Sequence, residues 1–355
     1  ADYLAGRRTL LILDNCEHLI AEVREFVIRL VDVGGVHVLA TSREALGVPD
    51  EQQIIVSPLD VTTAGVELFV DRARRREHRF ELNADNEAGV RAVVRHLDGI
   101  PLAIELAAAR IRLMTPVEIA DRLGSGIDVL DRGVRGGRHE TMRDTIRWSY
   151  NLLDPSEARL FERSSVFAGG FDLEAAEFIC ADDPAVTRSD VPQLIMTLLD
   201  KSMIDSTDVG GRQRFRMLEP LREFAADELR ESGETQRYRD RHAAFYLALA
   251  QRESERFFSP AEPDVWRVLD VEWSNFRTAL DTFERAGDLD SGAELVIALV
   301  WFAAMSMRYE LFGWAAELLE APEAERHPRF TDLCGAIAVR AYFTLDGQVT
   351  ERAEI

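Results

Sequence analysis

The stretch "GRRTLLILDNCEHLI", residues 6–20, decides how the start of the chain folds. Its four consecutive apolar residues, Leu10 to Leu13, predict a buried β-strand that ends on Asp14. The residues that follow begin a helical pattern. A strand that brings a carboxylate to its C-terminal tip places a ligand for Mg²⁺ where phosphates bind in open α/β sheets. Asp14 is therefore a candidate metal ligand.

A second apolar run, "VHVLATS" at residues 36–42, follows the helical pattern after a Gly34–Gly35 stop. A strand, a helix and a strand at this length predict a right-handed βαβ unit whose parallel strands are buried on both faces. A third run, "QIIVSPL" at 53–59, is predicted to complete a small parallel sheet.

Three polar residues, Thr41, Ser42 and Arg43, follow the second strand and are expected at the same sheet edge as Asp14. An arginine there can bind a terminal phosphate through two hydrogen bonds. Each candidate has an ordinary structural alternative. Asp14 can cap the turn into the helix, and Arg43 can form a surface ion pair.

The remainder of the chain is predicted to be mainly α-helical and divided into several domains. The hairpin pattern at 201–218, two β-prone arms around "DVGG", follows helices and suggests a winged helix. The predicted order is a partial nucleotide-binding α/β domain at 1–62, a helical lid at 63–124, a linker at 125–139, a winged-helix domain at 140–235 and an incomplete array of tetratricopeptide-like repeats, an α-solenoid, at 236–355.

Composition narrows the classes of function. The 355 residues carry a net charge of −21, which opposes direct binding to nucleic acid. No apolar run is long enough to span a bilayer, so no membrane contact is expected. The three cysteines are far apart in sequence, which favours free thiols in a cytoplasmic protein.

A further motif, "GIPLAIELAAAR" at 99–110, opens an apolar helix. Gly99 precedes Pro101 and Leu102, and a proline in the first turn of a helix costs no hydrogen bond. The structural alternative is a buried helix of the lid.

Taken in order, "LLILDN", "VLATSRE", "IIVSPLDVTTAGVELF" and "GIPLAIELAAAR" resemble the NB-ARC/STAND class of signal-transduction ATPases. They are similar to its Walker B, sensor 1 and "GLPL" motifs. The chain is most similar to large actinobacterial regulators of the LuxR and SARP type, some of which carry a cyclase domain. Segments including "FRMLEPLREFAADEL" resemble the winged helix of that group, and the resemblance covers nearly the whole chain.

This resemblance implies that the intact protein binds ATP or ADP with Mg²⁺. Asp14 is implied to bind Mg²⁺ through water, Arg43 to sense the γ-phosphate, and Pro101 to pack on adenine. Gly99 and Leu102 belong to the same motif as Pro101, and Asn15, Thr41 and Ser42 are implied to lie at the nucleotide.

Two positions depart from the family pattern. Asn15 stands where vigorous ATPases often place a carboxylate base, so at most slow ATP hydrolysis is expected. Met217, Leu218 and Glu219 replace a Met-His-Asp motif, and leucine cannot donate a hydrogen bond to the β-phosphate. Glu219 keeps only the carboxylate of that motif.

The chain contains no G-x-x-x-x-G-K-[ST] loop, and Lys201 is its only lysine. Such a loop supplies most of the affinity for phosphate through backbone N–H groups. We therefore expect little or no bound nucleotide in these 355 residues. A fragment whose phosphate loop lies before Ala1 is the expected explanation, and a degenerate pseudo-ATPase is the alternative.

The leading hypothesis is the signalling core of an ATP/ADP-switched regulator, which is expected to act on transcription through an effector elsewhere. The terminal repeats are expected to bind an inducer or a partner protein, and activation is expected to involve self-association. One alternative is a nucleotide-free interaction scaffold. Another is DNA binding through the winged helix, which the apolar stretch at 191–204 and the net charge of −21 oppose.

Overall fold

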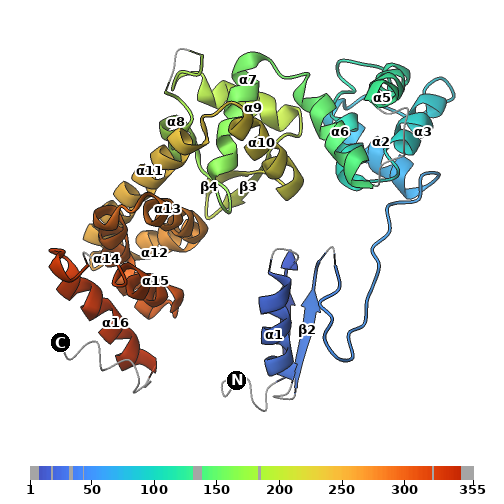
Figure 1. Ribbon diagram of the computed structural model, residues 1–355. Helices are drawn as coiled ribbons and strands as arrows, with labels where there is room; N and C mark the ends of the chain where they lie inside the picture. Colours follow the sequence, from blue (N-terminus) through green and yellow to red (C-terminus); the bar gives the residue numbers. More distant parts are fainter. Residues whose placement is uncertain are drawn as a thin grey trace. The chain divides into compact units, whose positions relative to one another are not determined.

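The computed structural model describes residues 8–16, 19–31, 35–42, 44–130, 138–182, 185–321 and 324–344. The chain divides into two compact units, residues 1–58 and 59–355. The first is a small α/β unit, whereas the second, where the structure describes it, is helical apart from one β-hairpin. The chain is thus mainly α-helical, as predicted (Figure 1).

The first unit is the predicted βαβ segment. It contains β1 (Thr9–Leu13), α1 (Ile20–Val31) and β2 (Val36–Ala40). The strands are parallel, with Thr9 opposite Val36 and Leu13 opposite Ala40. A small apolar core around Cys16, Val27 and Leu46 joins α1 to one face of the strand pair. The βαβ prediction is therefore confirmed.

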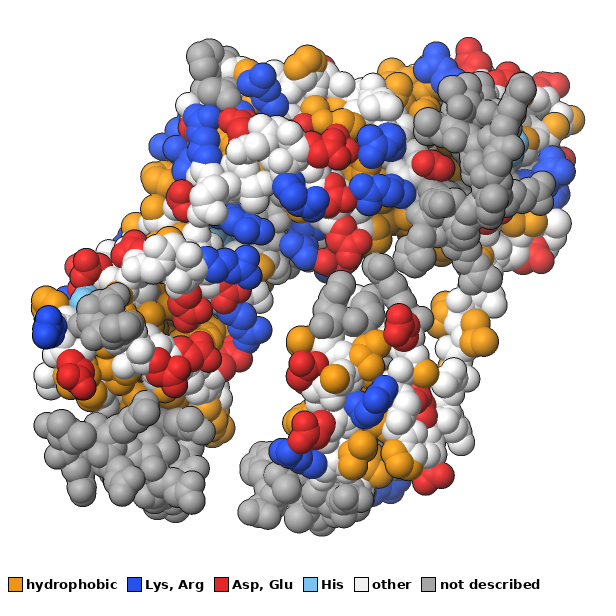
Figure 2. All heavy atoms as spheres, in the orientation of Figure 1, with side chains coloured by type: hydrophobic (Ala, Val, Ile, Leu, Met, Phe, Trp, Pro, Cys, Tyr) orange, Lys and Arg blue, Asp and Glu red, His pale blue; other side chains and the backbone are white. Residues whose placement is uncertain are grey.

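The prediction that both faces of these strands are buried is wrong. Leu10 and Ile12 are each 62% exposed, and Leu39 is 50% exposed. Successive side chains of a strand point to opposite faces, and α1 covers only one of them. Figure 2 accordingly shows hydrophobic side chains at the surface of this unit.

The predicted third strand at 53–59 is also absent from the described structure, because residues 51–60 form no strand. Ile54, Ile55 and Val56 are 82%, 82% and 87% exposed. Apolar, β-branched residues favour a strand only where a neighbouring strand accepts their backbone hydrogen bonds, and Pro58 offers no N–H at all. The sheet that the structure describes here therefore has two strands.

The second unit begins with helices whose apolar faces meet in a core of their own. Phe69, Val90 and Ile104 are completely buried in this core, which extends to Leu123. The helices are α2 (Ala64–Arg76), α3 (Glu87–His96), α4 (Pro101–Ala108) and α5 (Pro116–Leu130). Helix α5 occupies the first residues of the predicted linker at 125–139, and residues 131–137 lie outside the described ones.

A second group combines helices with the predicted hairpin. Its elements are α6 (Arg138–Tyr150), α7 (Pro155–Arg163), η2 (Ser164–Val166), α8 (Leu173–Ile179), α9 (Val191–Asp200), β3 (Asp205–Val209), β4 (Arg212–Arg216) and α10 (Glu219–Glu231). β3 and β4 pair antiparallel around Gly210 and Gly211, whose φ angles of 62° and 81° suit a type I′ turn. The hairpin is confirmed, and the winged-helix assignment stays a prediction.

Helix α9 forms most of the apolar stretch at 191–204 that opposes DNA binding. Leu194, Ile195 and Leu198 on α9 are buried. Lys201, which follows it, donates to the buried carboxylate of Glu157 on α7. The one basic group of this segment is therefore engaged in an internal ion pair.

The last part of the second unit is helical, as predicted. It contains α11 (Thr235–Arg256), α12 (Glu262–Val271), α13 (Trp273–Ala286), α14 (Leu289–Met305), α15 (Glu310–Leu318), η3 (Ala324–Arg326) and α16 (Phe330–Thr344). Helix α11 packs against α13 and α14, and α14 packs against α15 and α16. Their core is continuous with that of α6–α10. The tetratricopeptide assignment itself stays a prediction.

The cysteines are free thiols, as predicted, with Cys16 and Cys180 buried. Among the described residues, no helix is long and apolar enough to cross a membrane. The same residues include no cluster of three or more His, Cys, Asp or Glu side chains that could hold a metal ion.

Candidate functional site

The ends of β1 and β2 bring two predicted site residues into contact. Leu13 lies opposite Ala40 in the parallel register, so the next residues, Asp14 and Thr41, leave the sheet at the same edge. The Thr41 hydroxyl donates to Asp14 Oδ1. It also accepts a hydrogen bond from the backbone N–H of Asn15 at 2.9 Å. Asp14 and Thr41 of the predicted group are therefore neighbours at this edge.

Backbone hydrogen bonds hold this edge in shape. Thr41 N donates to Leu13 O at 2.8 Å, and Cys16 N donates to Thr41 O at 2.9 Å. Asn15 adopts a left-handed φ of 60°, which reverses the chain so that Cys16 enters the core. Asparagine tolerates this conformation better than most residues. Asn15 thus has a local structural role beside its predicted role at the nucleotide.

The remaining edge residues are Ser42 and Arg43. Ser42 is exposed, and its hydroxyl accepts from the backbone N–H of Glu44 at 3.3 Å. Arg43 lies outside the described residues, so its predicted contact with a phosphate stays a prediction.

The oxygen ligands at this edge suit Mg²⁺ only if a phosphate supplies further ligands. Asp14 and Thr41 offer exposed carboxylate and hydroxyl oxygens, which are the hard ligands that Mg²⁺ prefers. Mg²⁺ in nucleotide sites commonly takes one or two carboxylates and completes its shell with water and phosphate oxygens. Asp14 can supply such a carboxylate, but this edge is not a metal cage by itself.

Gly99, Pro101 and Leu102 belong to the other compact unit, and their local geometry has a structural explanation. Gly99 has a φ of 69°, and a Cβ there would lie 2.1 Å from the carbonyl oxygen of Leu59. Leu59 N also donates to Gly99 O at 2.9 Å. Only glycine fits so close a backbone approach. Pro101 is exposed at the first position of α4, and Leu102 is partly buried.

Glu219 lies in the first turn of α10, in the same unit. Arg222 holds its carboxylate through Nε at 3.0 Å and Nη2 at 2.5 Å. The Glu219 side chain is 37% exposed. The Glu219 carboxylate is therefore already paired with an arginine one helical turn away.

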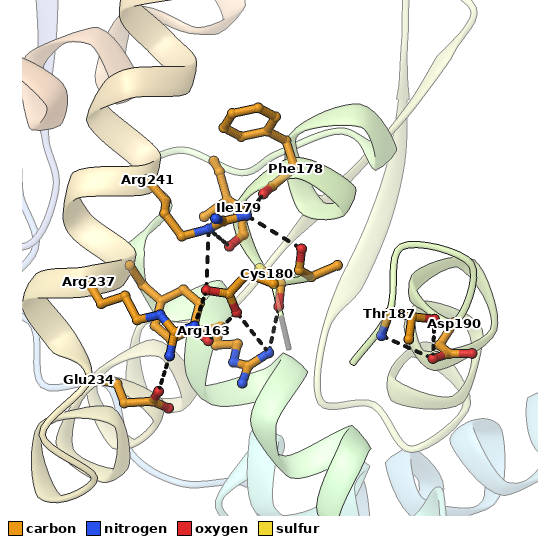
Figure 3. Close-up of polar contacts among 12 residues, drawn as sticks. Arg163, Phe178, Ile179, Cys180, Thr187, Asp190, Glu234, Arg237 and Arg241 are labelled. Atoms are coloured by element: carbon orange, nitrogen blue, oxygen red, sulfur yellow. Dashed lines mark hydrogen bonds and ion pairs between the residues drawn. The ribbon is translucent and has the colours of Figure 1, made fainter. Parts of the chain in front are cut away.

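One polar cluster of the second unit was not predicted from the sequence. It surrounds Asp182, whose side chain is only 7% exposed. Figure 3 labels three arginines of this cluster, Arg163, Arg237 and Arg241. Tyr238 on α11 donates its hydroxyl to Asp182 at 2.8 Å. Arg237 contacts the other carboxylate oxygen at 2.6 Å, and Arg163 and Arg241 each lie 3.8 Å from Asp182. We call these five residues the Asp182 junction.

The junction ties α7 and the end of α8 to α11. Arg163, which is 1% exposed, donates to Cys180 O at 2.7 Å, and its guanidinium lies 4.7 Å from the centre of the Tyr238 ring. Arg241 donates to Ile179 O at 2.8 Å, and also to Phe178 O, so it caps the C-terminus of α8. Burial and the hydrogen bond to Asp182 raise the pKa of Tyr238.

One sequence signal pointed toward this cluster. "RYRDR" at 237–241 places two arginines four residues apart with a tyrosine between them, so both arginines lie on one side of a helix. Their shared partner could not be found in this way, because Asp182 lies more than fifty residues earlier, after a different helix.

No known family model matches the chain. It is 38% identical over 347 residues, 96% of its length, to the protein named "Putative HTH-type transcriptional regulator Rv0890c" of Mycobacterium tuberculosis (strain ATCC 25618 / H37Rv). The protein named "Putative HTH-type transcriptional regulator Mb0914c" of Mycobacterium bovis (strain ATCC BAA-935 / AF2122/97) matches with the same identity and coverage. "Uncharacterized protein Rv0894" of the M. tuberculosis strain is 39% identical over 231 residues, which are 64% of this chain and 58% of that protein.

The chain spans 38% of the length of the regulators that it matches. Among solved structures, it is similar to the Signal Transduction ATPase with Numerous Domains (STAND) protein with a tetratricopeptide repeat sensor PH0952 from Pyrococcus horikoshii. That match covers 98% of this chain and 48% of the other, with a TM-score of 0.44 and 16% identity. The predicted relationship to actinobacterial regulators is thus confirmed, and over nearly all of its length the chain is homologous to mycobacterial proteins named as HTH-type transcriptional regulators.

Proposed function

We propose that the chain is the signalling core of a STAND-type regulator of transcription that is switched by ATP and ADP in the intact protein. Two observations support this proposal. The relatives named as transcriptional regulators match 96% of the chain. The contact between Asp14 and Thr41 supports the nucleotide-binding part of the proposal, because it places a carboxylate and a hydroxyl at the carboxyl edge of two parallel strands.

In this proposal, Asp14 would hold the Mg²⁺ of a bound nucleotide, and the Thr41 hydroxyl would fix the orientation of the Asp14 carboxylate. Asn15 cannot act as a general base, because a carboxamide does not take up a proton near neutral pH. The arrangement therefore suits a slow switch better than a rapid ATPase. The helices from α11 onward would bind an inducer or partner protein, and the Asp182 junction would connect them to the segment that carries the hairpin.

The absence of a G-x-x-x-x-G-K-[ST] loop from these 355 residues limits what they can bind alone. One carboxylate and one hydroxyl provide no cradle of backbone N–H groups for phosphate. We therefore expect the chain to bind Mg-ATP and Mg-ADP with a Kd above about 1 mM, which corresponds to no more than about 4 kcal/mol of binding free energy.

The test is calorimetric titration of two proteins with Mg-ADP and Mg-ATP. One is the chain itself, and the other carries an added strand, G-x-x-x-x-G-K-[ST] loop and helix ahead of residue 1. Chromatography of nucleotide released on denaturation accompanies both titrations. The proposal expects binding only with the added loop, at micromolar Kd. Tight binding to the chain alone would show that other groups hold the phosphates.

An interaction scaffold that does not use nucleotide is the second candidate, and one observation favours it. The Glu219 carboxylate, the remnant of a family nucleotide motif, is already held by Arg222. The scaffold predicts that a correctly folded protein with the added loop still fails to bind Mg-ADP. The same titration therefore separates the two candidates.

A further inference from the structure

The second unit contains a cavity that the nucleotide proposal does not use. Its volume is about 300 Å³, at the lower end of the size of small-molecule sites. It lies between the β3–β4 hairpin, the start of α8, the C-terminal half of α11, and α12. It therefore adjoins both the hairpin and the first of the helices that we expect to sense a signal.

One part of the cavity wall is apolar. Phe245 and Leu249 face it from α11, and Val268 and Val271 face it from α12. Leu249 is buried, and Phe245 and Val268 are partly buried against the main core. A ligand with a compact hydrocarbon or aromatic body can gain binding free energy here by covering this apolar surface.

The rest of the wall is charged, and its carboxylates are already engaged. Glu272 pairs with Arg214 in a buried ion pair. Glu253, which is 2% exposed, accepts from Arg252 at 3.1 Å and from Arg256 at 2.7 Å. These acidic groups are therefore neutralised by the protein itself.

The remaining acidic groups of the wall also have partners. Glu174 accepts from Arg252 at 3.2 Å, and Asp264 accepts from Arg267 at 2.9 Å. Asp172 accepts from the backbone N–H of Ala175 at 2.9 Å, where it caps α8. Each of the five carboxylates of this wall thus accepts a hydrogen bond, and four of them are paired with an arginine.

The arginines of the wall, in contrast, have donors to spare. Arg212 is exposed at the start of β4, and within the part of the chain that the structure describes its side chain makes no hydrogen bond or ion pair. Arg267 crosses the hairpin turn beside it, since a Cβ on Gly210 would lie 2.8 Å from Arg267 Cδ. Its pairing with Asp264 joins side chains that are 50% and 63% exposed, so a ligand can replace it at little cost.

We propose that this cavity binds a small organic anion, with a carboxylate or similar head group at Arg212 and Arg267 and an apolar body against Phe245, Leu249 and Val268. A guanidinium presents paired donors that match a carboxylate. The inference rests on the proposed function only where it identifies this anion as the inducer. Binding to the cavity itself requires no nucleotide.

The experiment is calorimetric titration of the chain, without nucleotide, with three probes of equal chain length: octanoate, 1-octanol and octylamine. We expect octanoate to bind at least 10-fold more tightly than 1-octanol and octylamine. The double variant Arg212→Gln/Arg267→Gln should lower the octanoate affinity at least 10-fold. The matched control is Arg188→Gln, which changes an exposed arginine paired with Glu177 outside the cavity and should leave the affinity unchanged.

Arg212 and Arg267 are both exposed, so variants at these positions should fold. Unfolding followed by tryptophan fluorescence checks that the variants are folded. The single variant Arg212→Gln provides a second, milder test, with an expected loss of about 3-fold or more. The proposal is overturned if octanoate does not bind, if 1-octanol binds as tightly as octanoate, or if the double variant binds like the parent chain. None of these results would affect the titrations with Mg-ADP, so the two proposals fail separately.

Discussion

The sheet edge at Asp14 and the Asp182 junction use the same chemistry in opposite surroundings. In each, an aspartate accepts a hydrogen bond from a hydroxyl group, from Thr41 at the edge and from Tyr238 at the junction. The edge residues Asp14 and Thr41 are exposed. The Asp182 side chain is 7% exposed and is surrounded by three arginines.

The difference shows how burial separates a ligand-facing carboxylate from a structural one. Water and ligands reach an exposed aspartate, and its single contact contributes little to stability. A buried aspartate must have its charge balanced by the protein, so removing it leaves buried cations without a partner. The sequence motif predicts a functional role for Asp14, whereas Asp182 contributes more to the free energy of unfolding.

The largest expected effect therefore comes from Asp182→Asn compared with Asp14→Asn. Asp182→Asn removes a carboxylate charge that lies 3.8 Å from Arg163, whose side chain is 1% exposed, and 2.6 Å from Arg237. Breaking a buried ion pair in this way costs about 3–5 kcal/mol of unfolding free energy. Asp14→Asn should change the stability of its own unit by less than about 0.5 kcal/mol.

Amide hydrogen exchange measured by mass spectrometry reads both units in one experiment. Denaturant unfolding followed by tryptophan fluorescence reports residues 59–355 alone, because all five tryptophans lie at or after Trp148. Equal losses of protection in the two variants would contradict the comparison.

The comparison also predicts where acid destabilises the molecule. His242 on α11 is buried beside Phe167 and Tyr246, and burial lowers its pKa from 6.5 to about 4. The unfolded chain binds a proton on this histidine at higher pH than the folded chain does. The stability that neutral His242 contributes is therefore complete above pH 6.5 and is lost as the pH falls toward 4, up to about 3 kcal/mol in total.

His242→Gln tests this origin, because its carboxamide can still reach Asn275 Oδ1, which lies 3.1 Å from His242 Nε2. Unfolding free energies of the variant and the parent chain are compared at pH 7 and pH 4.5. The difference between them should shrink or reverse in favour of the variant at the lower pH. Parallel pH profiles would assign the acid sensitivity to other groups.

The smallest effect comes from deleting the two hydroxyl groups. Tyr238→Phe removes a buried hydrogen bond to Asp182 and should cost about 1–2 kcal/mol. Thr41→Val removes the matching hydrogen bond to Asp14 and the one from the backbone N–H of Asn15, but both are exposed and water replaces them, so the expected cost is below about 0.5 kcal/mol. Thermal unfolding measures the first, and exchange of the β1 amides measures the second. A larger loss of stability for Thr41→Val than for Tyr238→Phe would show that the sheet edge at Asp14 has a mainly structural role.

Much of the fold could be predicted because its signals are local. The apolar spacing of residues 64–76 and the Gly210–Gly211 turn each specify an element without reference to distant residues. The strand at 53–59 was wrongly predicted for the opposite reason, since a β-strand needs a partner that local sequence does not reveal. Ile54 and Val56 have the composition of a strand but remain exposed.

The candidate sites divide in the same way. Asp14 and Thr41 could be predicted as neighbours because parallel strands end at one sheet edge. The structural need for Gly99 could not, because it depends on the carbonyl group of Leu59. The Asp182 junction combines α7, α8 and α11, and the cavity at Arg212 combines the hairpin with α11 and α12. Such convergence of distant segments leaves no pattern at fixed spacing.

The central claim is that the exposed Asp14 carboxylate serves Mg²⁺ on a nucleotide. The most direct measurement is calorimetric titration of the protein with the added phosphate loop, with ADP, in the presence and absence of Mg²⁺, for the parent protein and for Asp14→Ala. We predict that Mg²⁺ raises the affinity of the parent protein for ADP at least 10-fold. Asp14→Ala should abolish this gain and leave the affinity for ADP without Mg²⁺ unchanged. The same gain from Mg²⁺ in both proteins would contradict the claim.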